Sequence, residues 1–185
     1  MKIIPISSPL EPRIIEKLKV GDQVSISGVI YAARDAAHKR LVQSLDEGKK
    51  LPFDLNGQLI YYMAPSPPRP GQIIGSAGPT TSSRMDSYTP RLLAAGLKGM
   101  IGKGSRSQVV RDAIKEYRAV YFAAIGGAAA LISKTIIKAE IIAYEDLGPE
   151  AIYRLEVENF PAIVTNDIYG GDLYQEGKAK YQVSL

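Results

Sequence analysis

The chain has 185 residues, of which 45% are hydrophobic and 23% charged, and its formal net charge is +4. These proportions are typical of an ordinary soluble globular protein, and the length indicates one domain. The chain contains no Cys and a single histidine, His38, which excludes a disulfide framework and disfavours a zinc or iron site built by this chain alone. The longest uncharged stretch, residues 119–133, is shorter than the roughly 20 residues of a membrane span. The N-terminus also lacks the features of a signal peptide, so we expect a cytoplasmic protein without a membrane segment.

Positive charge is concentrated in the first three quarters of the chain. Residues 1–138 contain 20 Lys and Arg against 10 Asp and Glu, whereas residues 139–176 contain nine acids and only Arg154. A basic surface attracts anions, although most surface lysines simply face solvent. The basic residues form no run, and no ribonucleoprotein or helix-turn-helix motif accompanies them. We therefore predict a small anionic ligand and no nucleic-acid partner.

In the first 72 residues the pattern predicts two helices and two strands. Ser8, followed three residues later by Glu11, has the spacing of a capping box and predicts a helix that begins near Pro9. The segment VSISGVI predicts a strand with an irregularity at Gly28. ARDAAHKRLVQSLDEG predicts a helix that ends at Gly48, and QLIYYMA predicts a buried strand before the proline-rich loop PSPPRPG.

From residue 73 onward short apolar segments alternate with helical patterns. Strands are predicted at IIGS, GMIGKG and AVYFAAI, and helices after GPTTSS and at SQVVRDAIKEY and GGAAALISK. Further strands and connections are predicted at EIIAYEDL, AIYRLEVENF and PAIVTND, followed by a polar tail. This alternation indicates an α/β (mixed α+β) fold, layered with helices around a mixed β-sheet.

The segment ARDAAH is the first of three that place polar side chains at a predicted strand end, where ligand sites of α/β proteins often lie. Arg34 and His38 are four residues apart and would share one helical face, and a helix N-terminus offers free N–H groups to an anion. Spacing alone favours a simpler interpretation, in which Arg34 pairs with Asp35 and His38 packs in the core.

The second segment, GSAGPTTSSR, places four hydroxyl side chains directly before Arg84. Hydroxyls beside an arginine suit a carboxylate or phosphate, and nearby cations that lower a hydroxyl pKa would favour its use as a base. Equally, Thr81, Ser82 or Ser83 would cap the following helix.

The third segment, GMIGKGSRS, resembles a phosphate-binding loop, but its spacing excludes that motif because Leu97 and Gly104 stand where Gly and a hydroxyl are needed. What remains is Lys103 on a glycine-flanked turn, a point charge suited to an anion, with Ser105 or Ser107 as a cap for the next helix. The glycine pair near residue 126 gives only weak support for a dinucleotide site.

Together the segments VSISGVIYAARDAAHKRL, IGSAGPTTSSRMDSYTP, GLKGMIGKGSRS and EDLGPEAIYRLEVENFPAIV resemble the β subunit of class I fumarate hydratases. That subunit is equivalent to the C-terminal domain of single-chain members. The resemblance covers about residues 10–175, so we expect a single domain over residues 1–185 with a polar tail at residues 176–185. L-tartrate dehydratase β subunits share GPTTSxRM, whereas KGSRS and EVENFPA favour fumarase. Some members also hydrate mesaconate.

The resemblance implies a swivelling β/β/α domain and reversible hydration of fumarate to (S)-malate. It also implies an oxygen-sensitive [4Fe-4S] cluster, three of whose irons are held by cysteines of a separate α subunit, in an α2β2 heterotetramer. A chain without Cys would then be half of an enzyme and would hold no cofactor of its own. The alternative from another class is a non-catalytic anion-binding domain that keeps the fold.

By motif matching, the resemblance assigns roles to individual residues. Arg34 and Arg84 would bind the carboxylates of the substrate, and Lys103 would add a third positive charge. Thr80 matches the residue proposed as the base for the C3 proton of malate. Thr81 would form a hydrogen bond near the substrate, and we interpret three further residues as orienting Arg34 and Arg84, namely Asp35, His38 and Asp86.

Overall fold

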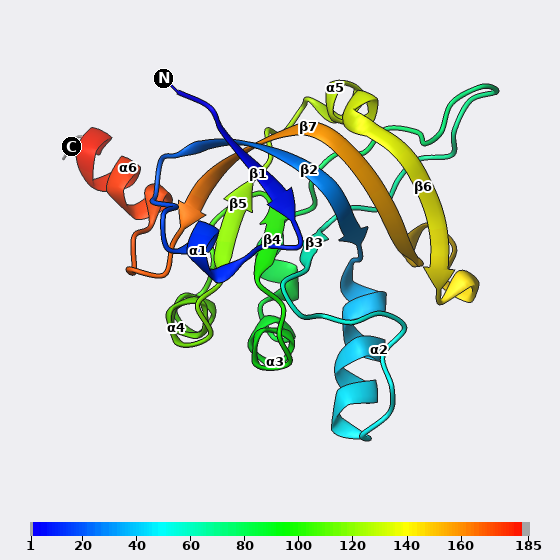
Figure 1. Ribbon diagram of the computed structural model, residues 1–185, viewed down its shortest axis with the longest axis horizontal. Helices are drawn as coiled ribbons and strands as arrows, with labels where there is room; N and C mark the ends of the chain where they lie inside the picture. Colours follow the sequence, from blue (N-terminus) through cyan, green and yellow to red (C-terminus); the bar gives the residue numbers. More distant parts are fainter. Residues whose placement is uncertain (1, 183–185) are drawn as a thin grey trace.

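The computed structural model describes residues 2–182, and over this range seven β-strands form one mixed sheet with three of the α-helices packed along one side (Figure 1). The strands are β1 (Ile4–Ser8), β2 (Gln23–Ala32), β3 (Leu59–Tyr61), β4 (Gly99–Gly102), β5 (Val120–Ala123), β6 (Ile136–Ala143) and β7 (Ile152–Asn166). The α-helices are α1 (Pro12–Ile15), α2 (Asp35–Asp46), α3 (Thr89–Ala94), α4 (Gln108–Glu116), α5 (Ala129–Ile132) and α6 (Leu173–Tyr181). Short 3-10 helices are η1 (Ser82–Met85), η2 (Ser133–Thr135) and η3 (Glu145–Glu150).

The sheet closes on itself. Its strand order is β1-β2-β3-β4-β5-β7-β6, and an additional pairing joins β2 to β7. Strands β2, β3, β4, β5 and β7 therefore form a closed five-stranded barrel, in which β2 to β5 run parallel and β7 runs antiparallel to both β2 and β5. The mixed α/β class is confirmed, whereas the closure was not anticipated from the sequence.

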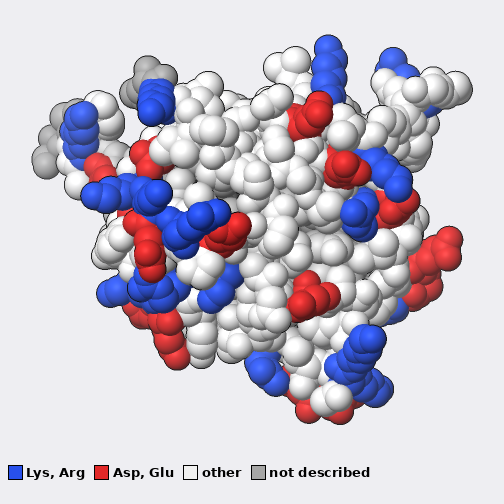
Figure 2. Space-filling view, in the orientation of Figure 1, with Lys and Arg blue, Asp and Glu red and all other residues white. Residues whose placement is uncertain are grey.

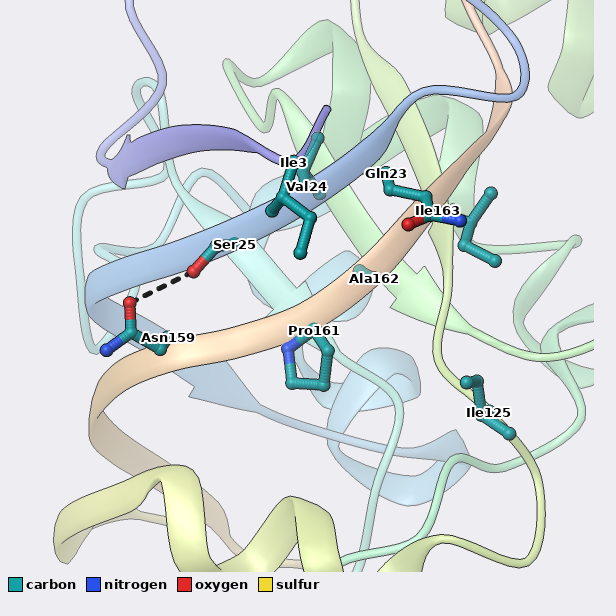
Figure 3. A pocket seen from close by; sticks show the side chains of 9 residues that line it. All are labelled: Ile3, Gln23, Val24, Ser25, Ile125, Asn159, Pro161, Ala162 and Ile163. Atoms are coloured by element: carbon teal, nitrogen blue, oxygen red, sulfur yellow. Dashed lines mark hydrogen bonds between the residues drawn. The ribbon is translucent and has the colours of Figure 1, made fainter. Parts of the chain in front are cut away.

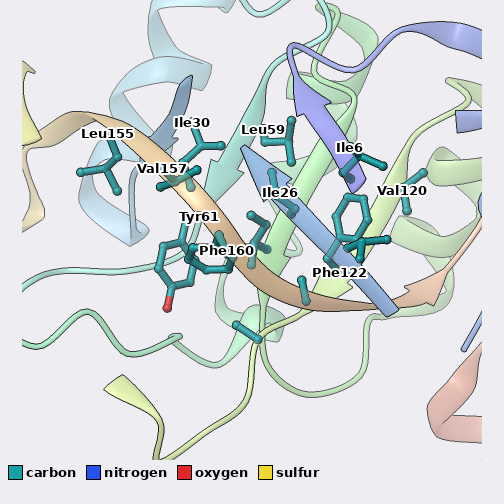
Figure 4. Packing of buried hydrophobic residues seen from close by; sticks show 14 of the residues in the cluster. Ile6, Ile26, Ile30, Leu59, Tyr61, Val120, Phe122, Leu155, Val157 and Phe160 are labelled. Atoms are coloured by element: carbon teal, nitrogen blue, oxygen red, sulfur yellow. The ribbon is translucent and has the colours of Figure 1, made fainter. Parts of the chain in front are cut away.

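Two hydrophobic clusters fill the fold because the parallel strands are buried on both faces. Strand β3 shows the alternation, since Leu59 and Tyr61 belong to one cluster and Ile60 to the other. The first cluster lies inside the barrel (Figure 4), where the ring of Tyr61 meets Phe160 edge-on with centroids 5.1 Å apart. The second lies between the barrel and helices α2, α3 and α4.

The predicted irregularity at Gly28 is confirmed. The register between β2 and β7 shifts between Ile26 and Gly28, and Gly28 has φ +106°. A Cβ at this position would lie 2.7 Å from the carbonyl oxygen of Ser8 in β1. On the opposite strand Asn159 has φ +53°, and its backbone N–H donates to Ser27 Oγ at 3.1 Å. Glycine is thus required where β1 and β7 both approach β2 closely.

The predicted helix start at Ser8 is wrong. Ser8 is the last residue of β1, which pairs in parallel with β2, and helix α1 begins only at Pro12, with Glu11 at the N-cap position and no side-chain cap. Burial of Ile6 in the barrel cluster accounts for this, because sheet pairing with an apolar side chain outweighs a local capping pattern.

Three further elements differ from prediction. Residues 73–76 form no strand but lie in a loop folded back on itself, where Ser66 N donates to Ser76 O at 3.2 Å. AIYRLEVENF and PAIVTND are one strand, β7, which continues through Pro161. Much of the predicted polar tail at residues 176–185 is helix α6, whose N-cap Asp172 accepts from Tyr174 N at 3.0 Å, while residues 183–185 lie outside the described part.

Other predicted boundaries are confirmed. Helix α2 is followed by Gly48 at φ +66°, and Ser107 is the N-cap of helix α4, where its Oγ accepts from Val110 N at 3.5 Å. Among residues 2–182 no helix is long and apolar enough to cross a membrane.

Candidate active site

The carboxyl ends of the four parallel barrel strands meet at one end of the barrel. The register places Ala32 of β2 beside Tyr61 of β3, Tyr61 beside Ile101 of β4, and Ile101 beside Phe122 of β5. The residues that follow these strands therefore gather at the same end, including Arg34 after β2 and Lys103 after β4. Ligand sites of α/β proteins favour this edge.

The segment before η1 is held between the ends of β3 and β4 by backbone hydrogen bonds. Thr80 N donates to Tyr62 O at 2.7 Å, and Lys103 N donates to Thr80 O at 3.3 Å. Ser82 N in turn donates to Lys103 O at 2.9 Å, and Thr81 pairs with Lys103 as a parallel bridge. Thr80 and Thr81 of the GSAGPTTSSR segment are thus brought together with Lys103 of the GMIGKGSRS segment at the end of the barrel.

Gly102 makes this close approach possible. A Cβ on Gly102 would lie 2.0 Å from Ser82 Oγ and 2.9 Å from Tyr62 Cδ2, so no larger residue fits without moving the loop. Ser82 is buried, and its Oγ accepts a hydrogen bond from the Tyr121 hydroxyl at 2.8 Å. The glycine of the GKG motif therefore has a packing role next to Lys103.

Asp35 links the two arginines singled out by the sequence. Its Oδ1 accepts from Arg84 Nε at 2.9 Å, and its Oδ2 lies 3.6 Å from Arg34 Nε. Two guanidinium groups would repel each other if brought together without an intervening carboxylate. The predicted orienting role of Asp35 has this geometric support, and the Arg34–Asp35 pairing that spacing alone favoured is present.

Glu150, which sequence reasoning did not single out, forms a closer ion pair with Arg34. Its Oε1 lies 2.8 Å from Arg34 Nη2, and its Oε2 accepts from Ala36 N at 3.1 Å. Glu150 is the last residue of η3, in the acidic segment EDLGPEAIYR. In the sequence, only its place in the segment EDLGPEAIYR pointed to Glu150. No local pattern relates Glu150 to Ala36, because 114 residues separate the two positions.

Arg106 was also missed, although it stands in the KGSRS motif. Its side chain is fully buried, and its Nε donates to Asp86 Oδ1 at 2.8 Å. Its other nitrogens contact Thr89 Oγ1 at 2.7 Å and the Tyr62 hydroxyl at 3.2 Å, and its guanidinium lies 4.9 Å from the ring centroid of Tyr121. A buried guanidinium held by four neighbours is a structural centre beneath the site loops.

This finding corrects the prediction for Asp86. We expected Asp86 to orient Arg84, but its carboxylate binds Arg106 through Oδ1 and accepts from Ser107 N through Oδ2 at 2.7 Å. A fully buried cation needs a partner more than an exposed one does. Asp86 therefore joins the segment that carries Arg84 to the segment that carries Lys103. Its carboxylate binds neither the Arg84 guanidinium nor the Lys103 ammonium.

His38 lies next to the site but does not contact the guanidinium of Arg34. Arg34 precedes helix α2 in an extended conformation, so the expected shared helical face does not form. The His38 Nδ1 atom lies 2.8 Å from the Arg34 carbonyl oxygen, while Nε2 is buried without a partner. Burial lowers the pKa of His38 to about 4, so the ring is neutral at pH 7.

The remaining polar groups at this end of the barrel are available to a ligand. Among the described residues neither the Lys103 ammonium nor the Thr80 hydroxyl has a hydrogen-bond or ion-pair partner. The Arg84 side chain is 50% exposed, and within residues 2–182 its pairing is through Nε alone. Arg34, Arg84 and Lys103 are thus three cations on segments that meet at this end of the barrel, and such cations suit an anion.

A separate hollow of about 430 Å³ lies along β2 and β7 (Figure 3). Its lining includes Val24, Pro161 and Ile163, with a Ser25–Asn159 hydrogen bond of 3.1 Å at one end. On the face of the molecule drawn in Figure 2, the Lys, Arg, Asp and Glu side chains lie mostly toward the edges and the middle is largely uncharged. With no charged residue in its lining, this hollow is less suited to an anion than the end of the barrel that carries Arg34, Arg84 and Lys103.

Comparison with known proteins gives concordant matches. The family model described as Fumarase C-terminus matches residues 2–177. The chain belongs to this family. It is 41% identical over 164 residues to the aerobic class I fumarate hydratase of Escherichia coli and 38% identical to fumarate hydratase 2 of Leishmania major, matches that cover 88% of this chain.

The relatives differ in how much of their own length this chain covers. The chain spans only about 30% of the length of these fumarate hydratases. In contrast, a match of 37% identity to the putative L(+)-tartrate dehydratase subunit beta of Methanocaldococcus jannaschii covers 95% of this chain and 93% of that protein. This fumarase-family chain is therefore similar both to a part of longer fumarate hydratases and to almost the whole of a separate β subunit.

The residues of this chain do not fit an iron–sulfur cluster. The sequence has no Cys, and among residues 2–182 no three His, Asp or Glu side chains are grouped so as to hold a metal ion. This sequence therefore supplies none of the cysteines that usually hold such a cluster.

We predict that Arg106→Met lowers the free energy of unfolding by about 3–5 kcal/mol, because it leaves Asp86 without its cation in a mostly buried position. Urea denaturation measures this. Arg91→Ala, which removes an ion pair to Asp46 from a side chain that is 46% exposed, is the control and should cost less than about 1 kcal/mol. Equal stability of Arg106→Met and the wild type would contradict the structural role.

The buried His38 predicts a pH dependence of stability. Its pKa is lowered to about 4 from 6.5, so between these values the folded state binds fewer protons than the unfolded state. The contribution of neutral His38 to the free energy of unfolding is therefore fully present above pH 6.5. It is lost as the pH falls to 4, which lowers the stability by up to about 3 kcal/mol. His38→Gln should lack this component. NMR titration of the single histidine checks it directly, and a pKa near 6.5 would contradict burial.

Proposed function

We propose that this chain is the β subunit of a fumarate hydratase that interconverts fumarate and (S)-malate together with an α subunit. The observation that carries the proposal is the convergence of Arg34, Arg84, Lys103 and Thr80 at one end of the barrel, joined by Asp35 and by the backbone pairing of Thr80 with Lys103. Membership in the fumarase family supports the same conclusion.

The arginines are suited to bind the two substrate carboxylates. Asp35 contacts each of them through Nε, which leaves the terminal nitrogens of Arg84 free to form paired hydrogen bonds to a carboxylate. Lys103 adds a compact charge beside Thr80. Thr81, exposed next to Thr80, would donate a hydrogen bond near the substrate.

Thr80 is proposed as the base in the direction of malate dehydration. Its oxygen would take the proton from C3, the electron pair would form the C2–C3 double bond, and the C2 hydroxyl would leave as water after protonation by an acid of the α subunit. A threonine hydroxyl is a weak base, and the neighbouring cations would favour its ionised form. The half-buried position of Thr80 limits competing water.

The α subunit is required by the chemistry that this chain lacks. The [4Fe-4S] cluster implied by the resemblance finds no ligands among these residues, so we place it on the α subunit, in an α2β2 heterotetramer. The exposed side chains of Lys103 and Arg84 would then be covered when this domain, acting as a swivelling unit, closes on its partner.

L-tartrate is the alternative substrate, favoured by the match to a separate tartrate dehydratase β subunit. Mesaconate is a third dicarboxylate with the same pair of charges. We prefer fumarate because the KGSRS and EVENFPA segments are of the fumarase type. Anaerobic reconstitution with the α subunit, iron and sulfide, followed by absorbance with each substrate offered separately, ranks the three. No turnover by an intact complex would favour a non-catalytic anion-binding domain.

In this complex Arg84→Ala should lower kcat/KM for fumarate about 10²-fold or more, because it removes a positive charge that stabilises the bound dianion in the transition state. Arg91→Ala, in the nearby helix α3 and outside the site, is the matched control. Steady-state kinetics with both variants checks the assignment. A loss below about threefold for Arg84→Ala would make that residue structural.

Thr80→Ala should lower kcat by about 10² to 10⁴-fold with little change in KM if Thr80 transfers the C3 proton. Exchange of the malate C3 proton with deuterated solvent should fall in parallel. Thr81→Ala, which removes the neighbouring hydroxyl, provides the comparison. A Thr80→Ala enzyme within about tenfold of wild-type kcat would exclude the base role.

A further inference from the structure

We propose that Glu150 is a positioning residue of the dicarboxylate site, which holds the guanidinium of Arg34 in place through one terminal nitrogen and leaves the other free for the ligand. This inference rests on the proposed function, because it assigns Glu150 a task at the same site. The carboxylate of Glu150 lies 2.8 Å from Arg34 Nη2, a shorter contact than the 3.6 Å between Asp35 and Arg34 Nε.

Both oxygens of Glu150 are engaged, so its position is fixed at two points. Oε1 binds Arg34, and Oε2 accepts from Ala36 N in the first turn of helix α2 at 3.1 Å. A carboxylate is favoured at a helix N-terminus because the unpaired N–H groups there carry partial positive charge. An acid held in this way resists displacement by a substrate carboxylate, which suits an orienting role and not a competing one.

The backbone around Glu150 is anchored as well. Ala151 is buried, its N–H donates to Gly148 O at 3.0 Å, and Ile152 begins the barrel strand β7. Arg34 follows β2, the direct neighbour of β7. The pair thus spans two adjacent barrel strands at their ends, and its geometry follows from the barrel and not from a mobile loop.

Charge balance gives the second reason for Glu150. Asp35 alone faces both Arg34 and Arg84, which would leave an excess positive charge around one carboxylate. Glu150 supplies the second negative charge while it occupies only one terminal nitrogen of Arg34. Within the described residues Arg34 Nη1 has no partner, so Arg34 retains N–H groups for a ligand.

A purely structural role is the competing explanation, and the same segment offers its control. Asp146, also in η3, forms a bidentate ion pair with Arg40 of helix α2, with Oδ1 2.8 Å from Nη1. Asp146→Asn therefore weakens the same η3–α2 contact without touching Arg34. Glu150→Gln keeps the size of the side chain and an oxygen for Ala36 N but loses the charge.

The test uses the reconstituted α–β complex, with kinetics on fumarate and calorimetric binding of malate for each variant. We expect Glu150→Gln to lower kcat/KM about 10 to 100-fold, mainly through KM, and Asp146→Asn to stay within about threefold of wild type. In an Arg34→Ala background Glu150→Gln should change kcat/KM by less than about twofold, because its effect passes through Arg34.

Two outcomes would overturn the inference while the function stands: equal losses for Glu150→Gln and Asp146→Asn, or a full further loss from Glu150→Gln in the Arg34→Ala background. An intact wild-type complex that binds malate without turnover would overturn the proposed function alone, and the same variants would then be compared by malate affinity. A complex that neither binds nor converts any dicarboxylate would overturn both.

Discussion

The buried guanidinium of Arg106 holds the loops of the candidate site in one arrangement. A charge in the interior is tolerated only when it is paired and fully hydrogen-bonded. Arg106 meets this requirement through Asp86 and Thr89 on either side of Tyr88, through the Tyr62 hydroxyl after β3, and through the ring of Tyr121 in β5. The loops that carry Arg84 and Lys103 are therefore held together by one buried residue beneath them.

The arginines above this buried centre are paired less completely than Arg106. Arg34 and Arg84 are partly exposed and are each paired on one side only, by Asp35 and, for Arg34, by Glu150. Partial pairing fixes a guanidinium while it leaves donors free, whereas full pairing, as at Arg106, removes the donors. The structure thus separates the arginine that supports the fold from the arginines suited to bind a dianion.

Closure of the barrel explains why residues from distant segments meet. Strands β2 and β7 are long enough for β7 to pair with both β2 and β5, which brings the end of η3 beside the start of helix α2. At the other side of the site, Gly102 lets Ser82 approach β4 and sets Thr80 next to Lys103. Both contacts join elements far apart in the chain, and neither is encoded by local pattern.

The sequence by itself determined the mixed α/β class, most helices and strands, and the motifs that contain Arg34, Thr80, Arg84 and Lys103, because periodicity, glycines and caps are local signals. Helix α4, with its Ser107 cap, and the irregularity at Gly28 illustrate this. Only the tertiary structure decided that Ser8 ends a strand, that Asp86 serves Arg106, and that Glu150 reaches Arg34. Ion-pair partners are determined by burial and by distance in space. Glu150 lies 116 positions along the chain from Arg34, so no local sequence pattern predicts their pairing.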